Sequence, residues 1–209
     1  MLINLLLHDP APSEDEPVTR FGGRPLVPAG EPFPWPVCAT CEGNMQFMGQ
    51  LRVPSDDGDR LLLLFQCQND PGLCEDWEAD AGGNRAMYFA ADRDLRLADF
   101  PTAGEVSRNT MYGARLEEHE AGNYDEASAA WIEDHQNRGR EVLGQLFGAP
   151  TWIQADETPE CDDCGGAMRF VAQLEEGPDY RTSMNFGGGA AYVFDCSCGS
   201  GAAKLLWQQ

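Results

Sequence analysis

Eight cysteines are the side chains of this 209-residue chain best suited to chemistry, because they form two matching sets. Each set opens with two cysteines separated by two residues. A second close pair follows after 25 residues in the first set and after 31 in the second. A C-x2-C turn can aim two thiolates at one metal ion, and a second pair completes a tetrahedron around it. The first set is Cys38, Cys41, Cys67 and Cys74, and the second is Cys161, Cys164, Cys196 and Cys198.

This pattern predicts one structural Zn²⁺ ion in each set. Four thiolates leave no open coordination position, so such a site stabilises a fold and does not activate water. Cys164-Gly165-Gly166 supplies a tight turn in the second set, and Pro71-Gly72 could bring Cys67 and Cys74 together in the first. Disulfides would require export, and a thioredoxin-like redox pair would need a strand–helix–strand context. Four thiolates could also hold an iron–sulfur cluster.

The charge of the chain restricts its partners. Acidic residues outnumber basic ones by 35 to 14, and the formal net charge is -21. This excess argues against nucleic acid and anionic membranes as partners, and it favours cations or a basic protein. The N-terminal stretch MLINLLL is apolar, but it lacks the basic region and cleavage site of a signal peptide and is too short to span a bilayer. We therefore expect a cytoplasmic protein.

The chain repeats itself at an offset of 123 residues. Seven of fourteen positions are identical between residues 38–51, CATCEGNMQFMGQL, and residues 161–174, CDDCGGAMRFVAQL. Upstream, Phe21-Gly22-Gly23-Arg24-Pro25 parallels Phe147-Gly148-Ala149-Pro150, and downstream Phe65-Gln66-Cys67 parallels Phe194-Asp195-Cys196. We interpret this likeness as a duplicated half-domain that packs against its twin.

Alternating and continuous apolar runs predict most of the strands. Period-two spacing predicts that Met45, Phe47, Gly49 and Leu51 share one face, and that Met168, Phe170, Ala172 and Leu174 repeat that face. The continuous run Leu61–Phe65 is typical of a fully buried strand. Further candidate strands are Ala86–Ala90, Ala190–Asp195 and Met111–Leu116.

A helix is predicted over about Asp125–Phe147, between the repeats. Asn123 or Asp125 could cap it, and Gly148 followed by Pro150 would end it. The side chains that would share an apolar face of this helix are Trp131, His135, Val142 and Leu146.

Catalytic constellations are absent from the sequence, so we do not expect an enzyme. None of the three histidines, His8, His119 and His135, stands in a known catalytic motif, and no nucleophile, base and orienting group can be assembled. Trp35 and Trp152 precede the two C-x2-C motifs and could pack beneath the metal sites or line a peptide groove. The repeated Gln50 and Gln173 could satisfy backbone groups or anchor a ligand's main chain, and we favour the first role.

Residues 20–36, RFGGRPLVPAGEPFPWP, resemble the entry motif of the YwqG-like family, a bacterial domain of unknown function. Residues 147–153 and 185–194 resemble the second repeat of that family, with Gly188 where an aspartate is usual. The same superfamily includes the programmed-cell-death-2 proteins, which are chaperones for a ribosomal protein. The resemblance implies a protein- or peptide-binding domain without an established reaction. A toxin-immunity role is the alternative that it suggests.

Together these observations predict an α+β fold in one domain, residues 1–209. Two tandem β-rich repeats, about 18–122 and 147–209, would be joined by a helix at about 123–148, each with a four-cysteine zinc site. The expected function is a non-enzymatic, zinc-stabilised module that binds a protein or peptide, chaperone-like toward a basic client. The alternatives are an immunity protein or an enzyme of unknown reaction.

Overall fold

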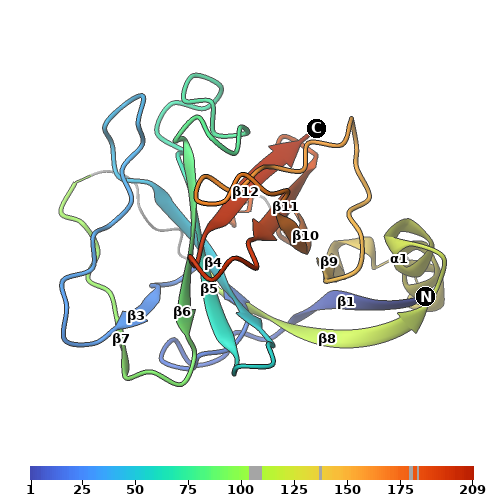
Figure 1. Ribbon diagram of the computed structural model, residues 1–209. Helices are drawn as coiled ribbons and strands as arrows, with labels where there is room; N and C mark the ends of the chain where they lie inside the picture. Colours follow the sequence, from blue (N-terminus) through green and yellow to red (C-terminus); the bar gives the residue numbers. More distant parts are fainter. Residues whose placement is uncertain (104–109, 137, 179–180, 183) are drawn as a thin grey trace.

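The computed structural model describes residues 1–103, 110–136, 138–178, 181–182 and 184–209. Of the described residues, 38% lie in strands or isolated bridges and 7% are helical. Most strands belong to one antiparallel sheet of ten, and a separate pair, β3 and β7, lies beside it (Figure 1). The elements are β1 Leu2–Asp9, β2 Arg20–Phe21, β3 Leu26–Pro28, β4 Gln46–Val53, β5 Arg60–Gln66, β6 Asn84–Ala90, β7 Leu95–Leu97, β8 Tyr112–Glu120, α1 Tyr124–Asp134, a 3-10 turn Gly139–Glu141, β9 Val142–Leu146, β10 Arg169–Glu175, β11 Ala190–Asp195 and β12 Ala203–Gln208.

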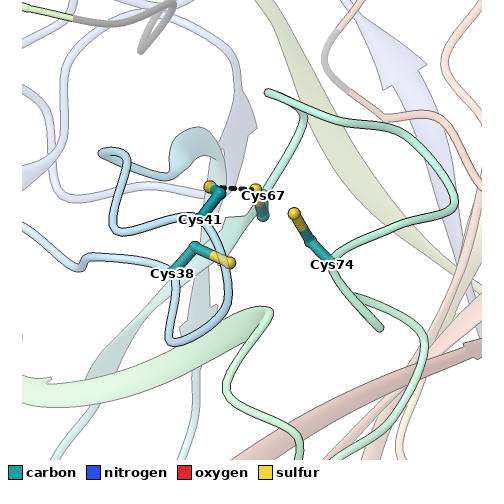
Figure 2. A group of neighbouring side chains, drawn as sticks. All are labelled: Cys38, Cys41, Cys67 and Cys74. Carbon is teal, nitrogen blue, oxygen red and sulfur yellow. Dashed lines mark hydrogen bonds between the residues drawn. The ribbon is translucent and has the colours of Figure 1, made fainter.

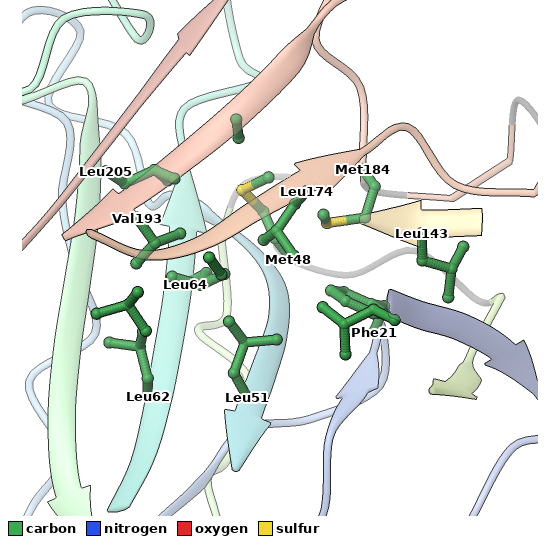
Figure 3. Close-up of a cluster of buried hydrophobic side chains, with 14 of the residues drawn as sticks. Phe21, Met48, Leu51, Leu62, Leu64, Leu143, Leu174, Met184, Val193 and Leu205 are labelled. Carbon is green, nitrogen blue, oxygen red and sulfur yellow. The ribbon is translucent and has the colours of Figure 1, made fainter. Parts of the chain in front are cut away.

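The large sheet has the strand order β12-β11-β10-β9-β1-β8-β2-β4-β5-β6 and is nearly closed. Its two end strands approach each other, and the backbone N–H of Trp207 in β12 donates to the carbonyl of Trp77, just ahead of β6 (3.2 Å). Apolar side chains from both halves of the sequence fill the space that the sheet encloses (Figure 3). The protein therefore has one central core to which both halves contribute.

The expected α+β fold with two tandem repeats joined by a helix is wrong. The two halves share one continuous sheet, because β1 pairs with β9 of the second half while β8 pairs with β2 of the first. β1 and β8 also pair with each other over eight residues at the centre of the sheet. Pairing over such sequence distances buries the sheet edges of both halves, and no local sequence pattern specifies it.

The expected helix ends much earlier than predicted. α1 begins after Asn123, whose side chain accepts a hydrogen bond from the Glu126 N–H (2.9 Å), and it ends at Asp134. Val142 and Leu146, predicted to lie on the helix, belong instead to β9, which pairs with β1 and β10. Apolar residues four apart fit either element, so their spacing did not separate helix from strand.

The predicted shared face in the repeated strands is also wrong, because each strand contains a bulge. The register of β4 against β5 shifts at Met48, and that of β10 against β11 shifts at Val171. Phe47, before the bulge, packs in an outer cluster with Cys38, whereas Leu51, after it, packs in the central core. A bulge adds one residue and so exchanges the two faces of a strand.

Several strand predictions are confirmed. Leu61–Phe65 lies within β5 and is completely buried. The bounds of β11 are those predicted, and β6 and β8 overlap their predicted segments. Sequence reasoning missed β1 and β12 and the short strands β2, β3 and β7. Two separate elements cover parts of the outer surface of the sheet. Helix α1 packs on β1 and β9 through Trp131, and the β3–β7 pair covers β4 and β5.

Candidate metal centres

The eight cysteines gather into the two groups that their spacing predicts. Within each group the four Sγ atoms all lie within 4.8 Å of one another. In the first group, two cysteines on one loop face two on another, and Cys41 Sγ lies 3.7 Å from Cys67 Sγ (Figure 2). A tetrahedral site with Zn–S bonds of about 2.3 Å has S–S edges of about 3.8 Å. The thiols of the first group thus already have the spacing of a tetrahedral metal site.

The second group has the same spacing. Cys161 Sγ lies 4.0 Å from Cys198 Sγ, and Cys164 Sγ lies 3.5 Å from Cys196 Sγ. All eight cysteines are free thiols. The donor set in both groups is therefore four sulfurs at metal-site spacing, which suits a soft or borderline ion such as Zn²⁺.

The two C-x2-C turns have the same backbone structure. Cys38 N–H donates to the Gly43 carbonyl at 2.9 Å, and in the second half Cys161 N–H donates to the Gly166 carbonyl at the same distance. The residue after the second cysteine adopts a left-handed conformation in both turns, with φ 57° at Glu42 and 69° at Gly165. The turn therefore tolerates a side chain at this position, and Gly165 does not distinguish the second site from the first.

The closing cysteines follow equivalent strands. Cys67 comes directly after β5, and Cys196 directly after β11. The loop from Cys67 to Cys74 turns at Gly72, whose φ is 78°, and this turn brings the two thiols of the pair to the same group, as predicted. Each site therefore joins a C-x2-C turn to the end of a core strand.

The thiols of the first group differ in pKa. The backbone of Gly43 and the amide of Asn69 lower the pKa of the Cys41 thiol to about 7. Burial raises the pKa of Cys67 and of Cys74. Asn69 Nδ2 lies 3.5 Å from Cys41 Sγ and 3.4 Å from Cys67 Sγ, so it orients both sulfurs. Without a cation, the four thiols resist becoming thiolates together.

The second group is more exposed, and the pKa values of two of its thiols are lowered. Hydrogen bonding by Ser200 lowers the pKa of Cys198 to about 6, and the backbone of Asp163 and Cys164 lowers that of Cys161. Cys164 and Cys198 are exposed, whereas only Cys41 in the first group is not fully buried. The first site therefore lies deeper in the protein.

The two tryptophans pack under the sites. Trp35 stacks edge-on against Phe65 (ring centroids 5.4 Å apart) in the cluster that contains Cys38. Trp152 lies 4.4 Å from the Tyr192 ring in the cluster that contains Cys161. These contacts support the packing role for both indoles.

The repeated glutamines satisfy backbone groups. Gln50 Oε1 accepts from the Leu26 N–H (3.3 Å), and Gln173 Oε1 accepts from the Thr151 N–H (2.9 Å). Gln50 and Gln173 stand 123 residues apart, whereas Leu26 and Thr151 stand 125 apart. The structure therefore aligns Gly22 with Phe147, and not Phe21 with Phe147 as the sequence repeat suggested. The N–H groups of Gly22 and Phe147 donate to equivalent carbonyls, at Met48 and Val171.

The histidines do not approach the sulfurs. His8 stacks on Tyr112, His119 Nε2 lies 2.9 Å from Glu117 Oε1, and His135 stacks on Trp131 with ring centroids 4.1 Å apart. None of the three belongs to either cysteine group.

A pocket of about 490 Å³ adjoins the first cysteine group, and no sequence motif marks it. Its walls come from the end of β5, the loop after it, and the C-terminal end of β12. Its lining residues include Pro71, Asp76, Trp77 and Trp207. Trp207 reaches the other three only through the closure of the sheet, which explains why sequence reasoning did not place them in one site.

No known family model matches this sequence, and no curated protein matches it. Among the described residues, no helix is both long and apolar enough to cross a membrane.

Proposed function

We propose that both cysteine groups bind Zn²⁺ and that the two ions are structural. The supporting observation is the pair of four-thiol groups, each with its sulfurs within 4.8 Å of one another. Four thiolates fill the coordination sphere of zinc, so a bound ion would hold the C-x2-C turn against the end of β5 or β11. A bound cation would also offset the mutual repulsion of the four thiolates.

The proposed role of the whole chain is that of a non-enzymatic module, which binds a protein or peptide with a basic surface. A net charge of -21 attracts a positively charged partner and speeds its association. Membership of the YwqG-like family, a chaperone-like role and a cytoplasmic location belong to this proposal, and they rest on the sequence alone.

A retention experiment tests the partner. The immobilised protein, and as control an unrelated protein of similar net charge without cysteine groups, are exposed to cell lysate at about 50 and about 150 mM salt. At the higher salt, we expect a defined basic protein to be retained by the immobilised chain and not by the control protein. If both columns retain the same proteins, or this chain retains none, binding of a basic partner is contradicted.

A further inference from the structure

Four charged side chains are buried in the described part of the protein, and three of them have charged neighbours. Asp195 accepts hydrogen bonds from Arg60 and Arg169, and Lys204 donates to two aspartates. The fourth is Asp76.

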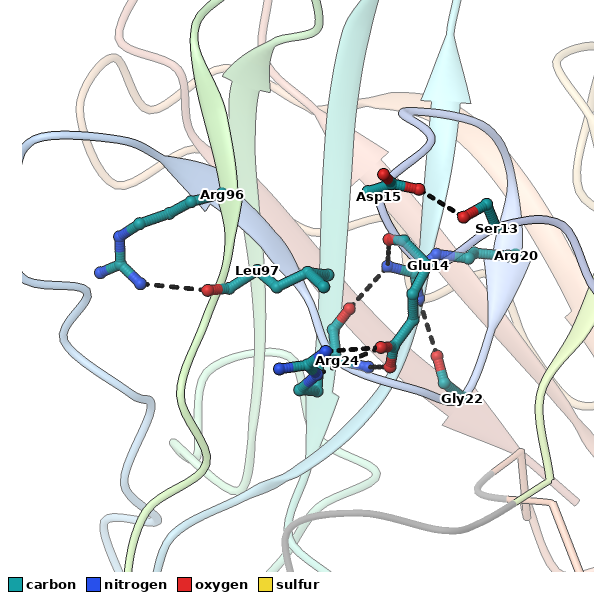
Figure 4. A network of polar contacts seen from close by, with 8 residues as sticks. All are labelled: Ser13, Glu14, Asp15, Arg20, Gly22, Arg24, Arg96 and Leu97. Atoms are coloured by element: carbon teal, nitrogen blue, oxygen red, sulfur yellow. Dashed lines mark hydrogen bonds and ion pairs between the residues drawn. The ribbon is translucent and has the colours of Figure 1, made fainter.

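Arg20 is the third buried group that has a charged neighbour. Its guanidinium donates to the carbonyls of Glu14, Gly22 and Arg24, and it lies beside the Glu14 carboxylate, which pairs with Arg24 (Figure 4). Burial lowers the pKa of Arg20 to about 10, and the charge of Glu14 opposes this effect.

Asp76 is different. It is 5% exposed, and its Oδ2 accepts from Gln66 Nε2 (2.5 Å) and Trp207 Nε1 (3.2 Å), which are both neutral donors. Within the described residues, no Arg, Lys or His forms an ion pair with it. A buried carboxylate without a cation is costly, and proteins normally pair it. This unpaired charge therefore suggests that its partner comes from outside the chain.

The pocket beside Asp76 has the surroundings that a cation prefers. Trp77 and Trp207 line it with their rings at 83° to each other and their centroids 6.3 Å apart. The described residues that line it include no Lys, Arg or His, and the carboxylate among their side chains is that of Asp76. Indole faces attract cations through their quadrupole, most strongly when the site is shielded from water.

The first cysteine group adds to this preference. Cys67, Pro71 and Gly72 of its closing loop form one wall of the pocket. Four thiolates outweigh the charge of one zinc ion, so the proposed metal centre is itself anionic and lies beside the pocket. A phosphate or carboxylate ligand would be repelled, whereas a guanidinium or ammonium group would be attracted.

We infer that this pocket binds one cationic side chain, arginine or lysine, of a basic protein partner. The group would lie against Trp77 and Trp207 and pair with Asp76. The inference rests on the proposed binding function and gives it a location and a chemistry. A volume of about 490 Å³ accommodates a single long side chain and the backbone on either side of it.

The test uses a short, end-blocked glycine–serine peptide that carries one arginine, and the same peptide with citrulline, which is neutral and almost isosteric. The five indole N–H signals of the zinc-loaded protein are followed by NMR during titration. We expect arginine to shift the signals of Trp77 and Trp207 and to leave those of Trp131 and Trp152 in place. Equal shifts with citrulline, or shifts spread over all the indoles, would overturn the inference.

Two matched variants separate a local effect from general charge. Asp76→Asn keeps the shape of the side chain, and Glu78→Gln removes the same charge from an exposed position two residues away. We expect Asp76→Asn to weaken arginine binding at least about tenfold, as loss of a charge-assisted bond would, and Glu78→Gln to change it less than about twofold. If the two variants weaken binding equally, the pocket is not the site.

The retention experiment distinguishes this failure from failure of the proposed function. If Asp76→Asn still retains the basic protein as well as the unaltered chain does, the partner binds elsewhere and only the pocket inference fails. If the unaltered chain retains no basic protein, the proposed function itself fails.

Discussion

A glycine in β9 allows its backbone to approach the neighbouring strand β10 closely. Gly144 in β9 has a φ of 132°, and a Cβ added there would lie 1.9 Å from the backbone oxygen of Gln173 in β10. The neighbouring Gln145 and Gln173 side chains bond each other and the turn after β9. A side chain at residue 144 would therefore separate two core strands.

We predict that Gly144→Ala destabilises the fold by roughly 3 kcal/mol or more, because both the clash and the backbone conformation oppose it. Gly165→Ala is the control, since it has a positive φ but nothing within 4 Å of the added Cβ. It should cost about 1 kcal/mol. Urea unfolding of the zinc-loaded proteins measures both, and similar losses would show that the close approach in β9 has little effect.

At the scale of the elements, the sequence predicted what local pattern encodes. β5 and β11 are continuous apolar runs bounded by polar or turn residues, and the C-x2-C turns are short and self-contained, so their positions were predictable. β9 was not, because Val142 and Leu146 fit a helix as well as a strand. The bulges at Met48 and Val171 were also invisible, since they depend on the register with the neighbouring strand.

Helix α1 is held to the second half by a half-buried carboxyl group. Tyr124 at its first turn donates to Glu175 Oε1 at the end of β10 (2.9 Å). Burial raises the pKa of Glu175 above its ordinary value of 4.5, and the Tyr124 hydrogen bond opposes this effect only in part. The folded state therefore holds the Glu175 proton more tightly than the unfolded state does.

The sign of the pH dependence follows from this raised pKa. The stabilisation from protonated Glu175 is complete below about pH 4.5 and is lost as the pH rises through the folded-state pKa. Glu175→Gln stays neutral, so its stability relative to the unaltered chain should increase as the pH rises above about 4.5, until the folded-state pKa of Glu175 is passed. Thermal unfolding across this range measures the difference, and a difference that stays flat or falls would refute the prediction.

At the scale of the whole molecule, the closure of the sheet brings together groups far apart in sequence. Arg60 of β5 reaches Asp195 of β11 (2.7 Å), and Arg169 of β10 pairs with the same carboxylate through two hydrogen bonds (2.9 and 2.8 Å). Asp195 is completely buried. The duplication was visible in the sequence, but this shared core was not, since only three-dimensional pairing joins the halves.

Asp195→Ala should destabilise the protein by about 3–5 kcal/mol, because it leaves Arg60 and Arg169 without their buried counter-ion. Glu117→Ala provides the comparison, since it breaks the partly exposed Arg115–Glu117 pair and should cost at most about 1 kcal/mol. Equilibrium unfolding in urea measures both. Comparable losses in the two variants would mean that the ion pairs of Asp195 contribute little to joining the halves.

The most direct test of the account is the metal content of the purified protein, measured by elemental analysis together with a count of free thiols. Two independent four-cysteine sites predict about two zinc ions per chain. Cys41→Ser and Cys164→Ser, which stand at equivalent positions in the two groups, should each retain about one. A metal content near zero with no free thiols would contradict the account and indicate disulfides instead.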